Sequence, residues 1–589
     1  MRVAQVVPLR RFPADRPWFD YLVPDGLTVD VGHLVEVPFG RQLLPGVVWA
    51  IADHSDIPEL KPIHRLLRPA PVVSQWQHRT LSQIADWYFV SLGHIVARAV
   101  PDWPKKLVDE PAPPPPPLRP HPAPDSRERV WWYRDRRQVM IQAIDWLLKD
   151  DRPRLICAPT SEDVAGFSAA LGDDRAQIGL VDSQTGERDY RMLYEQVRTG
   201  RLKKIIGTGQ ALLLPYPSVP GILLDQDDHP AHRQSEQHPR LDNRQTVALI
   251  APQAVVTTPA PSLPTFLTRH PHPPAFGGRR QLAVLGQPGS RDWLTPDAEE
   301  LIHATIQHGQ SLLAIVPHHG FAQRLTCREC GWTVTCQSCG SRVRLLRRTT
   351  DQADCQICGA AVKIPTSCPR CQAVSWHFGG LGVEQYMETI RHRWPKIPVY
   401  SADDPWPDQP GVVVGTYQAY RHHEYARPVL IISGDSLLSY PDYAVAERAW
   451  TYLARLQAAQ PDSLVMIQTY EPDLPFWQRW RHGDDRSWYA DELQQRTTLS
   501  LPPVAEHWIA RLPNGNQRDL EEKLQAAKGA LPSQVTITIM PADRRRWGRL
   551  TGRLLFQAPA GLALRPAVDW LKLFPPPWQL DPALRGWSD

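Results

Sequence analysis

Eight of the nine cysteines of this 589-residue chain lie in one short window, and all eight form CxxC pairs. The pairs are Cys327 with Cys330, Cys336 with Cys339, Cys355 with Cys358, and Cys368 with Cys371. Two thiolates on one tight turn can bind a metal ion from the same side, and Zn²⁺ takes four such ligands in a tetrahedron. The window therefore predicts two closed structural zinc sites, which leave no position for water or substrate.

The same ligands allow other interpretations. Four cysteines can hold an iron–sulfur cluster, and one CxxC pair can act as a redox dithiol. The spacing does not say whether consecutive pairs or nested pairs share a metal ion. Because only Cys157 lies outside the window, the cysteines indicate metal ligation in a reducing compartment rather than disulfide bonds.

A second group of reactive side chains is the acidic motif LLDQDDH, Leu223 to His229. Asp225, Asp227 or Asp228 could hold the metal ion of a nucleotide, as the acidic motif of ATP-hydrolysing motors does. The alternative is that these acids only cap the end of a strand.

Such a motor also needs a phosphate-binding loop with glycines, a lysine and Ser or Thr. At that position the chain reads APTSEDVAGF, Ala158 to Phe167, with no lysine, a single glycine near its end, and two acidic residues that would repel phosphate. The residues around Ala158, Thr160, Asp225 and Asp227 are therefore interpreted as a degenerate ATP site. From the sequence we expect no bound ATP and no catalytic residues.

Several domains must position these residues, because a chain of 589 residues is too long to fold around a single hydrophobic core. We expect a multidomain α/β protein. Its N-terminal half comprises a small β-rich domain (1–108), a proline-rich linker (109–126) and a first α/β lobe (127–289), which the apolar runs RLICA, KKIIGTG and GILLDQDD indicate.

The C-terminal half is expected to hold a second α/β lobe over 290–498. The cysteine window forms an insertion within it, over 326–375, and a small α/β domain covers 499–589. The net charge of +4 says little about partners. No apolar stretch approaches a membrane span and the N-terminus lacks a signal-peptide pattern, so we expect a cytoplasmic protein.

Several motifs together resemble the PriA family of bacterial primosomal replication-restart helicases. RPWFDYLVPDGL and VEVPFGRQ resemble its N-terminal domain, VPHHGFAQRLTCRECGW the start of its zinc region, and SYPDYAVAERAW and VMIQTYEPDLPFWQ its second lobe. The resemblance implies two RecA-like helicase lobes with a two-zinc insertion in the second. It also implies nested pairing, in which one zinc is bound by Cys327, Cys330, Cys368 and Cys371, and the other by Cys336, Cys339, Cys355 and Cys358.

The chain departs from the family pattern in its ATP-binding motifs. The phosphate loop is altered, LQAAQPDSL holds no arginine where the family carries arginine fingers, and GTYQAYRHHEYA lacks the usual lysine and glycine. The linker leads directly to the first lobe, so we expect the family's winged-helix domain to be absent. From these departures we expect a helicase-like protein that has lost its ATPase activity.

The resemblance assigns a pocket for the 3′ end of a nascent DNA strand to Phe19, Asp20, Gly40 and Lys61. Phe19 can stack on a base, Asp20 can accept a hydrogen bond from the 3′-hydroxyl, Gly40 allows close backbone approach, and Lys61 can neutralise a phosphate. Without the resemblance, Phe19 is interpreted as a core aromatic and Asp20 as a turn acid.

A basic cluster, DRRRWGRLTGR, lies near the C-terminus. Its side chains could contact the phosphates and bases of DNA, and they are those of Arg544, Arg545, Arg546, Trp547 and Arg549. The alternative is a solvated basic face.

The leading hypothesis is a nucleoid-associated, monomeric primosome protein that recognises stalled forks and D-loops by their structure. The resemblance implies single-stranded-DNA-binding protein, primosomal loader proteins and the replicative helicase as partners. The alternatives are an active ATP-dependent 3′→5′ superfamily-2 helicase and a zinc-ribbon scaffold without a DNA role.

Overall fold

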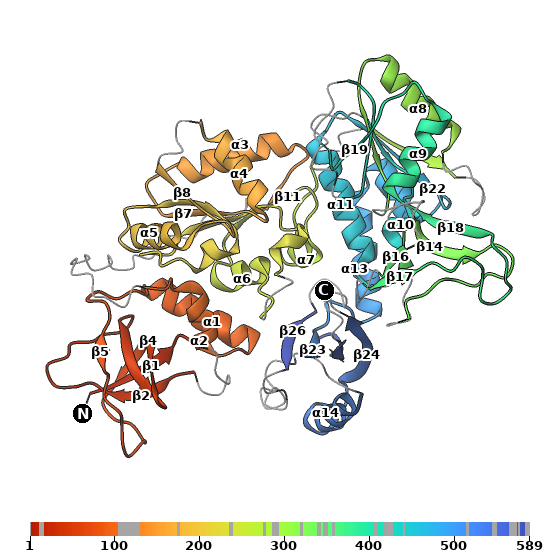
Figure 1. Ribbon diagram of the computed structural model, residues 1–589. Coiled ribbons are helices and arrows are strands. Elements are labelled where there is room, and N and C mark those ends of the chain that lie inside the picture. Colours follow the sequence, from red (N-terminus) through yellow and green to blue (C-terminus); the bar gives the residue numbers. More distant parts are fainter. Residues whose placement is uncertain are drawn as a thin grey trace. The chain divides into compact units, whose positions relative to one another are not determined.

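The computed structural model shows a chain that divides into two compact units (Figure 1). The units are Met1–Pro261 with Phe574–Asp581, and Ser262–Leu573 with Pro582–Asp589. The residues that the structure describes are 2–10, 17–103, 130–172, 177–234, 239–274, 279–285, 294–317, 322–337, 343–345, 352–355, 360–404, 409–417, 419, 428–439, 442–513, 517–544, 550–562, 564, 574 and 578–583.

The first unit begins with an antiparallel sheet in the order β2-β1-β4-β3-β5. The strands are β1 (Val3–Pro8), β2 (Phe19–Leu22), β3 (Leu34–Phe39), β4 (Gln42–Ala52) and β5 (Arg65–Leu66). The segment before β5 also pairs with β2, because the Leu22 N–H donates to the Lys61 carbonyl and the Ile63 N–H donates to the Leu22 carbonyl, both at 3.0 Å. This pairing joins the two edges of the sheet around an apolar core rich in valine.

Two helices, α1 (Gln75–Tyr88) and α2 (Leu92–Ala99), follow this sheet. Ser74 starts α1, because its hydroxyl accepts a hydrogen bond from the Gln77 N–H. The two helices share an apolar core with Leu213 and Leu241, which follow later in the chain. The Tyr88 hydroxyl accepts a hydrogen bond from the Asp242 N–H at 2.8 Å.

Leu213 and Asp242 belong to the first lobe, whose sheet is parallel and has the order β6-β11-β10-β7-β9-β8. The strands are β6 (Val130–Trp132), β7 (Arg154–Cys157), β8 (Ile178–Val181), β9 (Lys204–Gly207), β10 (Gly221–Leu224) and β11 (Val255–Thr258). The helices are α3 (Arg136–Leu148), α4 (Ser161–Ala170), α5 (Glu187–Arg198) and α6 (Asn243–Ile250), with two short 3₁₀ helices, Gly209–Leu213 and Pro230–His232. The sheet has an apolar core on each face, as the continuous apolar strand sequences require.

The second unit contains another parallel sheet, in the order β12-β22-β21-β13-β20-β19. Its strands are β12 (Arg279–Val284), β13 (Leu312–Ile315), β19 (Val399–Ser401), β20 (Val412–Gly415), β21 (Val429–Ile431) and β22 (Leu464–Thr469). Its helices are α7 (Leu263–Arg269), α8 (Pro296–Gln307), α9 (Val383–Arg393), α10 (Asp435–Leu438), α11 (Val445–Ala459), α12 (Pro475–His482) and α13 (Asp485–Thr498). The two parallel α/β lobes are RecA-like.

The cysteine window forms its own small sheets between β13 and α9. They consist of β14 (Ala322–Cys327), β15 (Val343–Arg344), β16 (Gln352–Cys355), β17 (Ala361–Lys363) and β18 (Trp376–Leu381). In the C-terminal region β25 (Leu550–Gln557) lies antiparallel between β23 (His507–Pro513) and β24 (Thr536–Arg544). The remaining elements are α14 (Gln517–Ala530) and β26 (Gln579–Pro582).

The multidomain α/β fold predicted from the sequence is confirmed. The expected domain limits stay predictions, and the expected linker, 109–126, lies outside the described residues. Among the described helices, none is both long and apolar enough to cross a membrane.

Candidate metal centre and nucleic-acid interface

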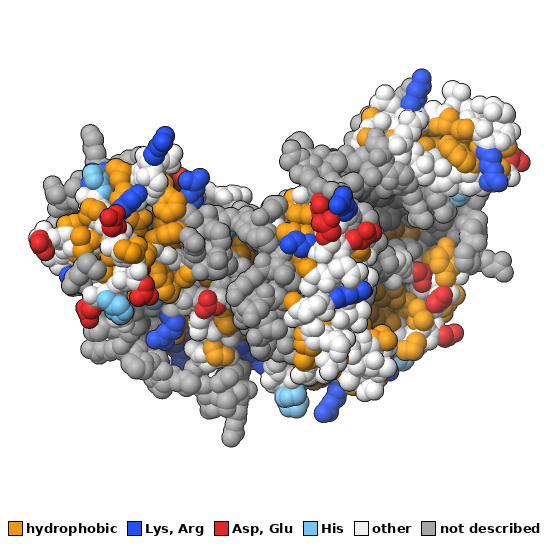
Figure 2. Space-filling view, turned by 90° about the horizontal axis from the view of Figure 1, so that it is seen from below, with side chains coloured by type: hydrophobic (Ala, Val, Ile, Leu, Met, Phe, Trp, Pro, Cys, Tyr) orange, Lys and Arg blue, Asp and Glu red, His pale blue; other side chains and the backbone are white. Residues whose placement is uncertain are grey.

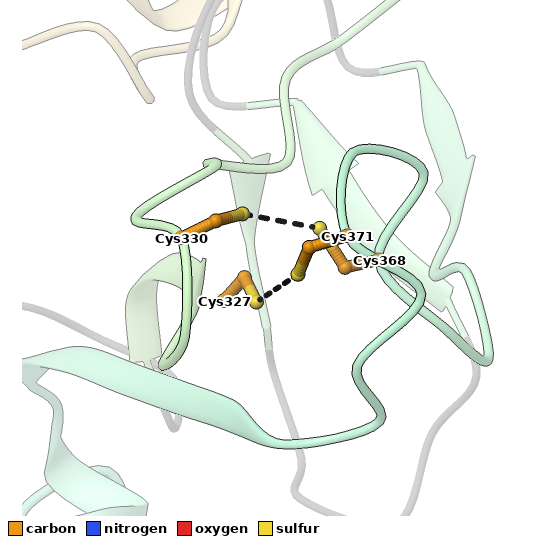
Figure 3. A group of neighbouring side chains, drawn as sticks. All are labelled: Cys327, Cys330, Cys368 and Cys371. Carbon is orange, nitrogen blue, oxygen red and sulfur yellow. Dashed lines mark hydrogen bonds between the residues drawn. The ribbon is translucent and has the colours of Figure 1, made fainter.

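Four cysteines converge at one point of the cysteine window: Cys327, Cys330, Cys368 and Cys371 (Figure 3). Their sulfur atoms all lie within 4.8 Å of one another, and the Cys327–Cys371 and Cys330–Cys368 sulfur distances are both 3.5 Å. Zn–S bonds of about 2.3 Å in a tetrahedron separate neighbouring sulfurs by about 3.8 Å. The cluster therefore has the ligands and approximate spacing that a tetrahedral metal ion requires.

The same backbone turn presents each half of this cluster. The Cys327 N–H donates to the Trp332 carbonyl at 2.7 Å, and the Gly331 N–H donates back to the Cys327 carbonyl at 3.1 Å. In the second half the Cys368 N–H donates to the Ala373 carbonyl and the Gln372 N–H donates to the Cys368 carbonyl, both at 2.8 Å.

Each turn has a residue with positive φ at its fifth position, Gly331 at +72° and Gln372 at +61°. A left-handed residue there closes a loop tight enough for two thiolates to face one point. Strand β14 ends at Cys327 and pairs with β18, where Cys327 lies opposite Trp376, just after the second turn. The pairing of these strands brings the two turns together.

The surroundings of Cys368 favour its thiolate form. Burial by itself raises the pKa of this thiol, but hydrogen bonds from the backbone of Cys371 and Arg370 and from the Cys330 and Cys371 side chains lower the pKa to about 7. For the neighbouring Cys371, a backbone hydrogen bond from Ala373 lowers the pKa, but burial and hydrogen bonds with the Cys330, Cys327 and Cys368 side chains raise it to about 12. Metal ions bind the thiolate, which Cys368 therefore forms more readily than Cys371.

The other cysteines of the window are described in part. Cys336 and Cys355 are buried in the apolar cluster of the insertion, and Cys355 lies opposite Val343 in the β15–β16 pair. The Cys355 N–H donates to the Ala360 carbonyl at 2.9 Å, the same contact that opens the turns at Cys327 and Cys368. Cys339 and Cys358 lie outside the described residues, so the second predicted zinc site stays a prediction.

The acidic motif follows β10, at the carboxyl end of a strand inside the parallel sheet of the first lobe. Asp225 is fully buried and Arg136 binds it bidentately, with Nη1 donating to Oδ1 at 2.6 Å and Nη2 to Oδ2 at 2.7 Å. The Thr257 hydroxyl donates to Oδ1 at 2.7 Å. Arg136 also donates to Asp163 in the first turn of α4, at 3.3 Å. Sequence reasoning missed Arg136, because no motif relates it to Asp225, 89 residues later.

The neighbouring residues of the predicted ATP site have structural contacts. Thr160 is the N-cap of α4, where its hydroxyl accepts a hydrogen bond from the Asp163 N–H, and the Ala158 N–H donates to the Gly207 carbonyl at 2.8 Å. Asp227 and Asp228 are buried, and the Thr258 hydroxyl donates to Asp228 at 3.2 Å. The strand–loop–helix backbone at which motors bind phosphate is therefore present, although its side chains differ.

The backbone of this motif is held by the buried His232 and the half-buried Arg244. The His232 Nε2 is 2.8 Å from the Asp225 carbonyl, and its Nδ1 is 3.2 Å from the Asn243 amide. Burial lowers the pKa of His232 to about 4, aided by the charge of Arg244. Arg244 pairs with Asp242 and donates to the carbonyls of Asp227 and His229, both at 3.2 Å.

The residues of the predicted 3′-end pocket lie on β2 and on the segments that pair with or pack against it. Phe19 is half-buried, and its ring meets Phe39 edge-to-face with centroids 5.1 Å apart. Phe39 directly precedes Gly40, the first residue of the two-residue turn between β3 and β4. Gly40 has a φ of +60°, and a Cβ there would meet no atom within 4 Å. The turn therefore requires glycine for its conformation, and the space beside it is open.

Asp20 and Lys61 are linked to the same strand. The Ser55 hydroxyl donates to Asp20 Oδ2 at 2.5 Å, and the exposed Lys61 follows the loop that carries Ser55. The Lys61 carbonyl accepts the Leu22 N–H, so the backbone at Lys61 is fixed beside β2. Ser55 was not predicted from the sequence, since a lone serine in a polar loop gives no signal.

The predicted C-terminal cluster is described only at its start, where Arg544 ends β24. Arg545, Arg546, Trp547 and Arg549 lie outside the described residues. On the face seen in Figure 2, acidic and basic side chains are interspersed among apolar ones.

Residues 6–101 match the family model PriA 3′DNA-binding domain (3′BD). Among similar proteins, the replication restart protein PriA of Rickettsia conorii is 21% identical over 86% of each chain. That of Rickettsia felis is 21% identical over 92% of each, and that of Haemophilus influenzae 22% identical over 96% of each.

These comparisons show that one expectation is wrong, namely that the chain is not an enzyme. Relatives covering 86–96% of its length carry the name replication restart protein PriA, a family of ATP-dependent helicases, and nothing in the match indicates a lost activity. The altered side chains at Ala158 and Thr160 are weak grounds for inferring a loss of ATPase activity, because helix N-termini bind phosphate largely through backbone N–H groups.

The domain match runs from within β1 to the end of α2 and includes Phe19, Asp20, Gly40 and Lys61. The match to the Haemophilus influenzae relative spans 96% of the chain, and so extends into both RecA-like lobes. The chain is therefore a relative of the replication restart protein PriA with an N-terminal PriA-type 3′ DNA-binding domain.

Proposed function

We propose that this protein binds the 3′ end of a nascent strand at stalled replication forks and D-loops and supports replication restart there. The observation that carries the proposal is the 3′ DNA-binding domain, in which the contacts of β2 tie Asp20, Lys61 and the Phe39–Gly40 turn to one strand.

Each of these residues has a chemical role in holding a strand end. Asp20 accepts a hydrogen bond from the 3′-hydroxyl, and a charged acceptor strengthens that bond. The exposed Lys61 pairs with a backbone phosphate. Gly40 leaves open space for the sugar and backbone, and the exposed part of Phe19 offers an aromatic surface to a base.

The metal centre supports a role in assembly. Two closed zinc sites, together with one small apolar cluster, stabilise the insertion, which gives partner proteins a rigid surface. We assign to this protein, as partners in the cytoplasm, single-stranded-DNA-binding protein, primosomal loader proteins and the replicative helicase. The C-terminal cluster that starts at Arg544 contributes contacts to branched DNA.

The test compares forks whose nascent strand ends in a 3′-hydroxyl with forks whose strand ends in a 3′-deoxy sugar, by fluorescence anisotropy. A hydrogen bond to a carboxylate is worth about 1.5–3 kcal/mol, so we expect at least about tenfold tighter binding of the hydroxyl end. Asp20→Ala should abolish this ratio, whereas Asp25→Ala, which removes an exposed turn carboxylate of the same domain, should not. An unchanged ratio in Asp20→Ala would contradict the proposal.

A further inference from the structure

Trp18 is an exposed aromatic side chain directly before β2. Its side chain is 39% exposed, whereas the next aromatic, Phe19, is half-buried against Phe39 and the apolar core of the domain. Phe19 and the buried Tyr21 both pack into the apolar core of the domain, so Asp20, which lies between them in β2, faces away from that core, and the exposed Trp18 directly precedes the strand. Of the two aromatic side chains that precede Asp20 in the chain, Trp18 is the more exposed and so offers a base the larger aromatic surface.

The carboxylate of Asp20 is held in one orientation. The Ser55 hydroxyl oxygen accepts the Ile57 N–H at 3.2 Å, which directs its own proton to Asp20 Oδ2 at 2.5 Å. Among the residues that the structure describes, none donates a hydrogen bond to Oδ1 of Asp20. The Ser55 hydroxyl thus fixes one carboxylate oxygen, Oδ2, and with it the orientation of the other, Oδ1.

We propose that Trp18, Asp20 and Ser55 form the subsite for the 3′-terminal nucleotide, a proposal that rests on the function proposed above. Asp20 Oδ1 accepts the 3′-hydroxyl, Ser55 holds Oδ2, and the indole of Trp18 stacks on the base of the same nucleotide. Alternate residues of a strand lie about 6.6 Å apart, a span that one nucleotide bridges between its base and its 3′ oxygen. Any base offers a face to the indole, so the subsite reads the end of the strand and not its sequence.

Stacking on Trp18 is tested with 2-aminopurine as the 3′-terminal base of the nascent strand in a fork. Binding of the unaltered protein should quench its fluorescence, because the base stacks on an indole. Trp18→Ala should lose the quenching and bind about 5- to 150-fold more weakly, the range for loss of one stacked base. Trp18→Phe should keep most of both. Leu43→Ala, which truncates another exposed apolar side chain of the domain (46% exposed), should resemble the unaltered protein.

The role of Ser55 is tested by the ratio of affinities for 3′-hydroxyl and 3′-deoxy ends. Ser55→Ala frees the carboxylate to rotate and should lower the ratio about two- to tenfold, whereas Ser55→Thr retains the hydroxyl and the ratio. A variant that only perturbed folding would weaken both ends equally and leave the ratio unchanged.

The outcomes separate this subsite from the proposed function. If Asp20→Ala abolishes the hydroxyl preference but Trp18→Ala keeps full quenching, or Ser55→Ala keeps the full ratio, the subsite is wrong while the proposed function stands. If Asp20→Ala keeps the preference, the proposed function itself fails.

Discussion

Replacing Arg136 by methionine should loosen the first RecA-like lobe at the end of β10. The Arg136 guanidinium occupies both oxygens of Asp225, at 2.6 and 2.7 Å, and the side chain of Asp225 is only 1% exposed. Methionine retains much of the apolar stem of arginine but removes the charge. The variant leaves a buried carboxylate whose described side-chain partner is the Thr257 hydroxyl, at 2.7 Å.

The magnitude follows from the burial of the two partners. Removing one partner of a buried ion pair costs about 3–5 kcal/mol. The Arg136 side chain is 16% exposed, so water reaches part of the pair, and Thr257 keeps one hydrogen bond to the carboxylate. Both facts favour the lower end, about 3 kcal/mol, which corresponds to about a 150-fold rise in the local opening equilibrium.

Hydrogen–deuterium exchange with peptide resolution measures this opening where it occurs. Peptides that cover β10 and the first turn of α4 should exchange faster in Arg136→Met. The matched control is Arg137→Met, which changes the exposed neighbouring arginine and should leave exchange unaltered. Adding Asp225→Asn to Arg136→Met removes the unpaired charge and should restore most of the lost protection from exchange.

Two results would refute this reasoning. One is less than a threefold change of exchange in the Arg136→Met variant, which would mean that the pair contributes little. The other is an Asp225→Asn change that recovers nothing, which would mean that the effect of Arg136 does not pass through the carboxylate.

Three further changes follow from the site geometry. His232 has a folded pKa of about 4 against 6.5 ordinarily, so its stabilisation is complete above pH 6.5 and is lost as pH falls towards 4; urea unfolding should show a loss of about 2 kcal/mol at pH 5, reduced in His232→Gln. Cys368→Ser should lower bound zinc from two ions per chain to one in a colorimetric zinc assay, and an unchanged content would contradict the assignment. Lys61→Ala should reduce the slope of log affinity against log salt by about one, without changing the hydroxyl preference.

The sequence predicted those strands and turns that are specified by residues close together in the chain. Runs such as RLIC and GILL are apolar throughout and end in small or acidic residues, and the structure has them as β7 and β10 of a parallel sheet. The CxxC spacing likewise specifies a turn that two thiolates can share, because the geometry lies within six residues.

The partners of the site residues were beyond prediction. Asp20 and Ser55 are 35 residues apart and Arg136 and Asp225 are 89 apart, and no periodicity connects them. The loss of ATPase activity was wrongly inferred from side chains at Ala158 to Phe167, since a motif compares residue types and does not report the backbone. A sequence motif therefore predicts a local backbone turn better than it predicts an enzymatic activity.

The 3′ DNA-binding domain and the first lobe are joined by buried hydrogen bonds as well as by apolar contacts. The Gln77 amide donates to the Leu213 carbonyl at 2.6 Å, the Asp242 N–H donates to Tyr88, and the Tyr190 hydroxyl donates to the Ala99 carbonyl at 2.9 Å. The domain is therefore attached rigidly to the lobe and not through a flexible linker. A strand end held in the proposed pocket at Asp20 would therefore move with that lobe, and its release would require a change inside the β domain itself.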